Sequence, residues 1–388
     1  MRSNYKKLGQ FIQEVNIRNS DLNVERLLGV SIRKVLMPSI ANTIGTNMKT
    51  YKIIKRNQFA YGPVTSRNGD KISIALLEDY DEAIISQAYV VFEIIDETQL
   101  LPEYAMMWFR RPEFDRYARF KSHGSARETF DWDELCDTEL PIPSIEKQQE
   151  IVVEYNTITN RIALNEQLNQ KLEETAQALY KHWFVDFEFP NEEGKPYKSS
   201  GGEMVYNEEL DKEIPVRWSV KSLSELYKFQ YGKGNNNPDN SGRYPIYGSN
   251  GIIGGYDKYN NEDSPVIGHI GINAGIVVYA FGKHYVTYNG VMCFLLKNDW
   301  KWFSYLTLCS IDLMSQTRGS SQPFVSYDML YENLVVIPRW EKMDVFEKHI
   351  AKAFKRIENN KIFNQTLQVF QNLLLAKMTK VEETTKIC

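Results

Sequence analysis

The chain repeats part of its sequence at a distance of 195 residues, and this repeat constrains the fold more than any other feature. HGSARETFDWDELCDTELPIP begins at His123, and RGSSQPFVSYDMLYENLVVIP begins at Arg318. The two blocks align without a gap, from a shared Gly-Ser near the start to a shared Ile-Pro at the end. The repeat therefore predicts two copies of one structural unit; the alternative is two unrelated strand-turn segments.

Each copy continues into an amphipathic stretch in which apolar residues recur four and three positions apart, the pattern of a coiled coil. Both stretches carry two asparagines in the middle of the apolar seam, where a polar residue costs stability but fixes the register. The predicted seam residues of the two copies are Ile158, Ile162, Asn165, Asn169, Leu172, Ile357, Asn360, Asn364 and Leu367.

Two equivalent helices in one chain can pair antiparallel, and the numbers of paired residues then have a constant sum. Such a pairing places Asn165 opposite Asn364 and Asn169 opposite Asn360, so that each amide finds an amide partner. Helices of about 35 residues would be about 50 Å long and would act as a rigid spacer between two globules. The alternative is that each helix packs on its own globule, with the asparagines in water.

Composition along the chain predicts an α+β fold with two α/β domains, two long antiparallel helices that separate them as a coiled coil, and a pseudo-twofold internal repeat. Residues 184–215 are rich in glycine, proline, serine and charge, which is typical of a linker. The predicted blocks are a first domain at 1–143, a first long helix at 144–183, the linker, a second domain at 216–338, and a second long helix with a tail at 339–388.

The composition is that of an ordinary globular protein, with 43% hydrophobic and 25% charged residues. A net charge of −4 does not indicate a strongly basic polyanion binder. The four cysteines form no CxxC pair and the five histidines no HxxxH pair, so no metal site is predicted. Scattered cysteines, no secretory signal and no stretch long enough to span a bilayer predict a cytoplasmic protein without a membrane partner.

Catalytic motifs are absent from the sequence: there is no P-loop, no GxGxxG after a strand, no Asn-Pro-Pro-aromatic motif and no GxSxG elbow. One nuclease-like pattern consists of Asp186, Glu193 and Lys195. Such a site needs carboxylates on rigid strands to hold Mg²⁺, whereas these residues fall in the predicted linker. A solvated acidic linker is the favoured interpretation, and a metal-dependent nuclease is the alternative.

Binding features are stronger. A cluster of arginines and lysines between residues 110 and 127 runs into a Gly-Ser turn, which suits phosphate contacts. The matching loop in the second copy carries arginine and glutamine, the side chains that read guanine and adenine edges. The candidate DNA-binding residues are Arg67, Lys71, Arg119, Lys121, His123, Ser125, Arg127, Tyr247, Ser249, Asn250, Asn273, Arg318, Ser320, Ser321 and Gln322. The alternatives are salt-bridged arginines, a buried Gly-Ser turn and ordinary β-turn chemistry.

Over essentially its whole length, the sequence resembles the specificity subunit of type I restriction-modification systems. LPIPSIEKQQEIV, the long helix after it and ALYKHWFVDFEFP resemble the central conserved region of that family. EIPVRWSVKSLSEL resembles the entry to the family's second recognition domain, and YPIYGSNGIIGGY resembles the segment that follows.

The resemblance implies that residues 1–143 and 216–338 are target-recognition domains, each reading one half of a bipartite site in double-stranded DNA. It implies a non-catalytic chain whose long helices dock two methyltransferase subunits, with two ATP-dependent restriction (translocase-nuclease) subunits completing the complex. The methylated base would be adenine at N6. S-adenosylmethionine, ATP and Mg²⁺ would belong to the partner chains, and this chain would hold no cofactor. The second helix lacks a WFVDF segment, so unequal docking surfaces are expected. A protein-only scaffold is a further alternative.

Overall fold

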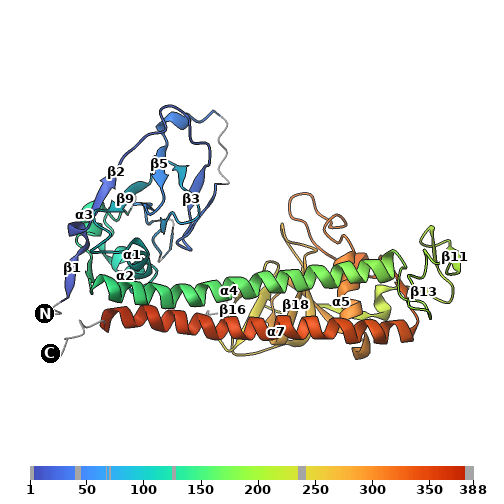
Figure 1. The fold of residues 1–388 in the computed structure, drawn as a ribbon. Helices are drawn as coiled ribbons and strands as arrows, with labels where there is room; N and C mark the ends of the chain where they lie inside the picture. Colours follow the sequence, from blue (N-terminus) through green and yellow to red (C-terminus); the bar gives the residue numbers. More distant parts are fainter. Residues whose placement is uncertain are drawn as a thin grey trace, which may run out of the picture. The chain divides into compact units, whose positions relative to one another are not determined.

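The chain divides into two compact units (Figure 1). In this computed structural model the described residues are 4–39, 45–66, 68–69, 71–124, 128–234 and 242–380. Unit 1 comprises Met1–Leu164 and Asn364–Cys388, and unit 2 comprises Asn165–Phe363. The division passes through two long helices, α4 (Ile145–Tyr180) and α7 (Trp340–Lys377). The expected blocks follow one another along the sequence and keep each long helix whole. The two units instead divide both helices, because each helix buries side chains in the core of both units.

Unit 1 is built on a four-stranded antiparallel sheet in the order β2-β9-β6-β7. Three further antiparallel strand pairs surround it: β1 with β10, β3 with β4, and β5 with β8. The strands are β1 (Tyr5–Lys7), β2 (Ile12–Val15), β3 (Leu28–Val30), β4 (Leu36–Pro38), β5 (Lys52–Lys55), β6 (Phe59–Tyr61), β7 (Ile74–Leu76), β8 (Glu82–Ile85), β9 (Val90–Ile94) and β10 (Glu139–Pro141).

Aromatic side chains form the core of unit 1. The rings of Phe59 and Phe92 stack with centroids 4.7 Å apart, and Phe109 meets Phe59 edge-on at 5.7 Å. The helices are α1 (Pro102–Phe109), α2 (Pro112–Lys121) and α3 (Trp132–Cys136), with short 3-10 turns η1 (Leu8–Gln10) and η2 (Met48–Thr50). A proline opens α1 and α2, because the first position of a helix does not need its N–H group.

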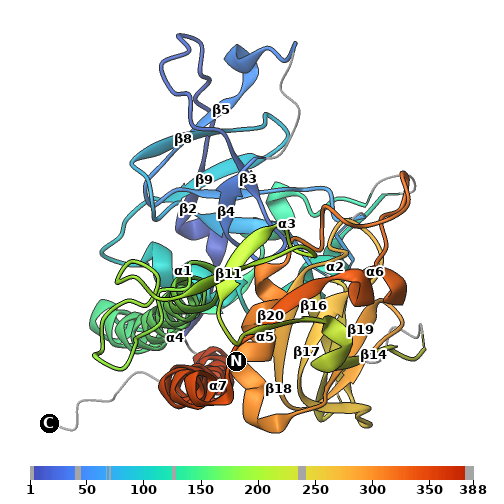
Figure 2. The same cartoon turned by 90° about the vertical axis from the view of Figure 1, so that its right-hand side faces the viewer.

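Unit 2 contains a six-stranded sheet in the order β14-β19-β17-β18-β15-β16. All neighbours are antiparallel except β15 and β18, which are parallel. These strands are β14 (Tyr227–Tyr231), β15 (Tyr244–Gly248), β16 (Gly251–Tyr256), β17 (Asn261–Gly268), β18 (Val277–Val286) and β19 (Gly290–Leu295). Helix α5 (Lys301–Ser310) packs against β18, where Trp302 lies 4.8 Å from Tyr279 between ring centroids (Figure 2).

Smaller elements complete unit 2. The hairpin β11–β12 and the antiparallel pair β13–β20 lie outside the large sheet. These elements are β11 (Met204–Asn207), β12 (Lys212–Pro215), β13 (Ser219–Ser222), β20 (Leu334–Ile337), α6 (Tyr327–Glu332), the 3-10 turns η4 (Leu223–Glu225) and η5 (Asn298–Trp300), and a π turn η3 (Lys181–Val185) that ends α4. A 3-10 turn η6 (Met378–Lys380) follows α7 in unit 1.

Within each unit, α4 and α7 pack on one another with opposite chain direction. In unit 1, Gln371 Nε2 donates to Thr159 Oγ1 at 2.7 Å. In unit 2, Asn360 Nδ2 donates to Asn169 Oδ1 at 2.8 Å, and both side chains are buried. This is the asparagine pair that the sequence predicts for antiparallel helices, in which the numbers of paired residues have a constant sum.

The other predicted seam residues are mostly covered as well. Ile357 is fully buried, and Leu367, Asn165 and Asn364 are also buried. Ile158, Ile162 and Leu172 are half-buried. In unit 1, Asn364 Nδ2 also donates to the Ile162 carbonyl at 3.4 Å.

The segment expected to be a linker is folded into unit 2. Phe187 and Phe189 are each 3% exposed, and the Phe189 ring stacks on Trp218 at 4.8 Å and on Tyr197 at 4.5 Å. Burial of these rings outweighs the effect of the surrounding glycine, proline and charge, which alone suggested a flexible connection. Among the described residues, no helix combines the length and hydropathy needed to cross a membrane.

The repeated sequence takes the same local structure in both units. Helices α3 and α6 begin 195 residues apart, as do strands β10 and β20 and helices α4 and α7. In each unit the repeated strand forms an antiparallel pair with an earlier strand of the same unit: β10 pairs with β1 in unit 1, and β20 pairs with β13 in unit 2.

Candidate nucleic-acid interface

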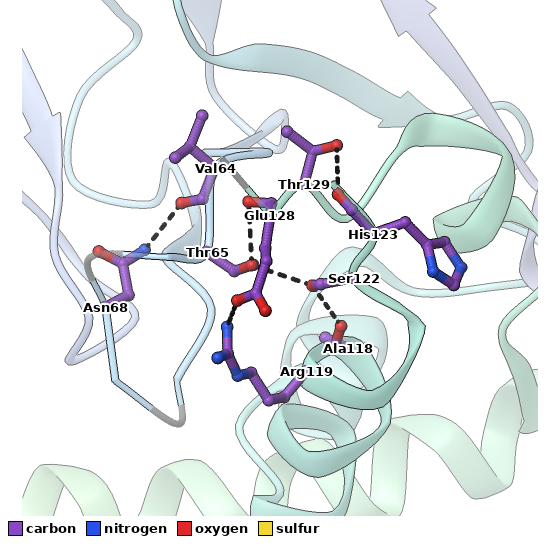
Figure 3. A network of polar contacts seen from close by, with 9 residues as sticks. All are labelled: Val64, Thr65, Asn68, Ala118, Arg119, Ser122, His123, Glu128 and Thr129. Atoms are coloured by element: carbon purple, nitrogen blue, oxygen red, sulfur yellow. Dashed lines mark hydrogen bonds and ion pairs between the residues drawn. The ribbon is translucent and has the colours of Figure 1, made fainter. Parts of the chain in front are cut away.

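Two loops of unit 1 are joined by backbone hydrogen bonds beside the end of strand β6. Figure 3 shows residues of both loops and the polar contacts among them. Loop 62–73 connects β6 to β7, and loop 122–131 connects α2 to α3. The Phe130 N–H donates to the Pro63 carbonyl at 2.8 Å, and the Thr65 N–H donates to the Glu128 carbonyl at 2.9 Å. Loop 122–131 is itself closed by a reciprocal pair of bonds between His123 and Thr129, at 3.0 and 2.8 Å.

Side chains tie the two loops to helix α2 (Figure 3). Thr65 Oγ1 donates to Ser122 Oγ at 3.0 Å, and Ser122 Oγ donates to the Ala118 carbonyl at 2.7 Å. Arg119 pairs with the Glu128 carboxylate in the same view. The described parts of the loops are therefore held in one arrangement, and the side chains of Val64 and His123 are exposed there.

The cations beside loop 122–131 are paired with carboxylates. Lys121 Nζ lies 3.0 Å from Glu134 Oε2, and this hydrogen bond raises the pKa of Lys121. His123 Nε2 lies 3.7 Å from the other Glu134 oxygen, with its ring largely exposed. Arg119 and Lys121 therefore form salt bridges in this structure, which was the alternative to DNA contact considered from the sequence. The Arg119–Glu128 pair is the more exposed of the two. Exposed ion pairs contribute little to stability, so an incoming anion can replace the Glu128 carboxylate.

Unit 2 carries the same pair of loops. Loop 317–326 is closed by reciprocal bonds between Arg318 and Phe324 at 3.0 and 2.8 Å, 195 residues after the His123–Thr129 pair. Its neighbour is loop 268–276, between β17 and β18. The Val325 N–H donates to the His269 carbonyl at 2.9 Å, which matches the bond from Phe130 to Pro63 in unit 1. Each unit therefore presents one hairpin loop and one copy of the repeated loop, joined in the same way.

The predicted residues of unit 2 gather around these loops. Arg318 is exposed, with its guanidinium 3.8 Å from the Glu332 carboxylate. Ser249 and Asn273 meet at Gly268, where an added Cβ would lie 3.0 Å and 2.1 Å from their carbonyl oxygens. Four further predicted residues are exposed: Asn250, Ser320, Ser321 and Gln322.

In unit 1, only some of the predicted DNA-binding residues are among the described residues. Lys71 is exposed near the end of loop 62–73. Arg67, Ser125 and Arg127 lie outside the described residues.

Tyr247 does not belong to this surface. Its side chain is 8% exposed and packs in a core cluster with Val266, Val286 and Met292. Burial raises the pKa of Tyr247 to about 12. Tyr247 lies on β15 between Ile246 and Gly248, which are also buried. The turn chemistry of the Gly-Ser-Asn sequence that follows it had suggested an exposed position.

An aromatic stack supports the loops of unit 2, and sequence reasoning missed it. The Tyr231 ring stacks on His269 at 4.1 Å and on Tyr327 at 4.0 Å between centroids. The hydroxyls of Tyr327 and Tyr331 accept the backbone N–H groups of Tyr231 and Phe229 on the edge strand β14. The spacing of four residues between the two tyrosines was the available signal, because it places both on one face of α6.

The three nuclease-like residues do not form one cluster of ion pairs, because Asp186 pairs with a residue outside the set. Asp186 pairs with Lys181 at 2.7 Å, and Glu193 pairs with Lys195 at 2.9 Å on an exposed turn. Across the described part of the chain, no group of three or more His, Cys, Asp or Glu residues is arranged to hold a metal ion. The geometry therefore gives the nuclease alternative no support.

Comparison with known proteins identifies relatives for most of the chain. The family model described as "Type I restriction modification DNA specificity domain" matches residues 34–174 and 215–370. The MjaIX specificity subunit of a type I restriction enzyme from Methanocaldococcus jannaschii is 26% identical over 321 residues, which cover 75% of this chain and 72% of that protein. The HindI specificity subunit from Haemophilus influenzae is 30% identical over 157 residues, which cover 40% and 34% of the two chains.

A solved structure shares the fold. The crystal structure of the S subunit of a type I restriction-modification system from M. genitalium aligns with a TM-score of 0.54 and 15% identity, over 97% of this chain and 96% of that chain. This chain mixes helices and strands, as that fold does. Its two regions that match the specificity-domain model agree with an organisation in two such domains.

Proposed function

Because the chain belongs to the family of type I restriction-modification DNA specificity proteins, we propose that it is the subunit that selects the DNA sequence for such a complex. Each unit reads one half of a bipartite target in double-stranded DNA. The observation that carries the proposal is the pair of hydrogen-bonded loops that occurs once in each unit, in the same arrangement. A duplex read at two half-sites requires two such surfaces.

The loops offer the side chains that DNA reading needs. Arg318 and Gln322 on loop 317–326 are exposed, and these residue types bind guanine and adenine edges through two hydrogen bonds. Arg119 and Lys121 stand beside loop 122–131, where they contact phosphates once their carboxylate partners are displaced. Since the two loop pairs differ in sequence, the two half-sites differ and the target is asymmetric.

The long helices are proposed to act as an antiparallel coiled coil that fixes the separation of the half-sites. The buried Asn169–Asn360 hydrogen bond supports this, because a polar pair in an apolar seam penalises other registers. The helices also dock two methyltransferase subunits, and restriction subunits complete the complex. S-adenosylmethionine, ATP and Mg²⁺ act in those partners, this chain is non-catalytic, and the complex works in the cytoplasm, where DNA is accessible.

Sequencing of modified bases in single DNA molecules tests the proposal. Genomic DNA is compared from a strain with the partner methyltransferase, with and without this gene, and with the gene restored. We expect a split motif with N6-methyladenine in both halves to vanish on deletion and return on restoration. A methylome that keeps the same split motif without the gene contradicts the proposal. Sequence-independent methylation in the presence of the gene would instead favour a protein-only scaffold.

A further inference from the structure

The tip of loop 268–276 in unit 2 presents an isoleucine to the outside. Ile272 is 85% exposed, more than any other large hydrophobic side chain that the structure describes. Isoleucine is among the residue types most often buried in proteins. A ligand that covers Ile272 at the proposed DNA surface would therefore remove apolar area from water, which favours binding.

The backbone holds Ile272 in one place. The Ala274 N–H donates to the Gly271 carbonyl at 2.9 Å and closes a four-residue turn with Ile272 at its second position. The Gly271 N–H donates to the Pro323 carbonyl at 2.8 Å, which ties the turn to loop 317–326. Ala274 is 2% exposed and anchors the turn in the core of unit 2. Because isoleucine is branched at Cβ, its side chain also has few rotamers to lose on binding.

The matching position in unit 1 carries a polar residue. Thr65 in unit 1 and Gly271 in unit 2 donate their N–H groups to equivalent carbonyls of the repeated loop, at 2.9 and 2.8 Å. The residue that follows is Ser66 in unit 1 and Ile272 in unit 2, and both side chains are exposed. A serine hydroxyl forms hydrogen bonds, whereas the isoleucine side chain forms none. Two surfaces with the same backbone bonds thus differ in chemistry at this position, as a position that distinguishes two half-sites should.

Duplex DNA offers few apolar groups to such a side chain. On the base edges of the major groove, the apolar group is the C5 methyl of thymine. A phosphate or a polar base edge would lose a hydrogen bond to water against isoleucine and gain none. Insertion between base pairs is the other use of an apolar side chain, but it requires the bases to unstack. A methyl contact needs no such distortion, so thymine is the favoured partner.

We propose that Ile272 is a specificity-determining residue of unit 2, and that it packs against the C5 methyl of one thymine in the half-site that this unit reads. This rests on the proposed function and names one base contact within it. Since no charge takes part, the contact contributes to base preference and not to the salt dependence of binding.

Ile272→Ser places in unit 2 the residue type that unit 1 carries at the matching position, and it tests the contact in the complex with the methyltransferase partner. Kd for a duplex with the methylated motif should rise roughly five-fold, since an apolar contact of about one methyl group is lost. Kd for an unrelated duplex and the slope of log Kd against log salt should stay unchanged. Because Ile272 is exposed, unfolding in urea should also be unchanged.

Deoxyuridine, which lacks the methyl group, identifies the thymine. Each thymine of the methylated motif is replaced in turn, on both strands of the duplex. At one position the wild-type complex should lose roughly five-fold in affinity. Ile272→Ser should then cost no further affinity at that position, because the two changes remove the same interaction.

Leu296→Ser is the matched control. Leu296 is 54% exposed in the same unit, but it follows the last residue of β19, whereas the first residue, Gly290, pairs with Gly268 at the start of the loop. The strand places Leu296 about 20 Å from that end, so the control should change neither Kd nor base preference.

An unchanged Kd for Ile272→Ser, an equal loss of affinity for an unrelated duplex, or the absence of a thymine at which the two changes coincide would each overturn the contact. A wild-type complex without sequence preference would instead overturn the proposed function itself.

Discussion

Arg119 and Glu128 form an exposed ion pair at the edge of the unit 1 loops, and the two residues should affect DNA binding in opposite directions. Glu128→Gln removes a negative charge and frees the guanidinium, so DNA binding should tighten. Arg119→Ala removes the proposed phosphate contact, so Kd should rise by a similar factor for all sequences, and the slope of log Kd against log salt should fall by about 1. Binding titrations at several salt concentrations measure both effects.

Lys147→Ala is the control for this pair, because Lys147 forms the same kind of exposed ion pair with Glu150 on α4. It should change neither the affinity nor the salt slope. If Arg119→Ala instead changed the preferred base at one position, Arg119 would read a base and the assignment to phosphate would be wrong.

Single residues show how far sequence reasoning reaches at this scale. It selected Arg119, Lys121 and Arg318 by residue type, and these lie where the loops of each unit meet the surface. It did not find Glu128 and Glu134, which neutralise two of these cations, because ion pairs depend on the three-dimensional arrangement. It placed Tyr247 on the surface, since a single sequence does not distinguish the inward from the outward residues of a strand with buried neighbours on both sides.

Among the elements, helix α5 depends on a carboxylate from α7 at its start. Glu347 Oε1 accepts the Phe303 N–H at 2.7 Å, and the first turn of α5 has no acidic residue of its own. The unpaired N–H groups at a helix start need such an acceptor. Burial nevertheless raises the pKa of Glu347 to about 7, from an ordinary value of 4.5.

This pKa predicts a pH dependence of stability. Between pH 4.5 and 7 the folded state keeps a proton on Glu347 that the unfolded state releases. The free energy of unfolding therefore falls as pH rises through this window, by up to about 3 kcal/mol from this group. Glu347→Gln removes this titrating carboxyl group. The free energy of unfolding of the variant minus that of the parent should therefore increase from pH 5 to pH 8.

Urea unfolding at four pH values in that range measures the difference between parent and variant. Asp344→Asn, at an exposed position one turn earlier on α7, should show no such pH-dependent difference. A constant difference for Glu347→Gln across the range would mean that Glu347 does not titrate in the window.

The pairing of the long helices leads to a second prediction for elements. Asn169→Leu alone leaves the buried Asn360 amide without its partner, so it should lower the free energy of unfolding by about 1–3 kcal/mol. Asn169→Leu together with Asn360→Leu replaces the pair by apolar contacts, so it should raise the thermal midpoint above that of the parent. A double variant less stable than the single one would argue against a seam position for these asparagines.

Elements encoded by the repeat were easier to predict than contacts between distant segments. The offset of 195 residues anticipates that loop 122–131 and loop 317–326 close alike, since their sequences match. It does not anticipate their partners, loops 62–73 and 268–276, because these do not lie at the offset of 195 residues. The buried Phe187 and Phe189 were missed for a similar reason, because their partner Trp218 comes after the predicted linker.

For the whole molecule, the proposed function divides the work between two loop pairs, one in each unit, and the helix pair α4–α7. In this proposal the loop pairs select the bases that are read, and the helices set the distance between the two half-sites. Changes in the loops should therefore alter one half-site at a time, and changes in helix length should alter only the spacer between them.

The most direct test lengthens both helices together. Seven residues in heptad pattern are inserted after Leu164 in α4 and after Asn364 in α7, so that Asn165 stays opposite Asn364. The methylated motif is read by sequencing of modified bases in a strain with the partner methyltransferase. Each insertion adds about 10 Å of helix, equivalent to about three base pairs of duplex. We expect unchanged half-sites with a spacer that is longer by up to that amount. An altered half-site with an unchanged spacer would contradict it.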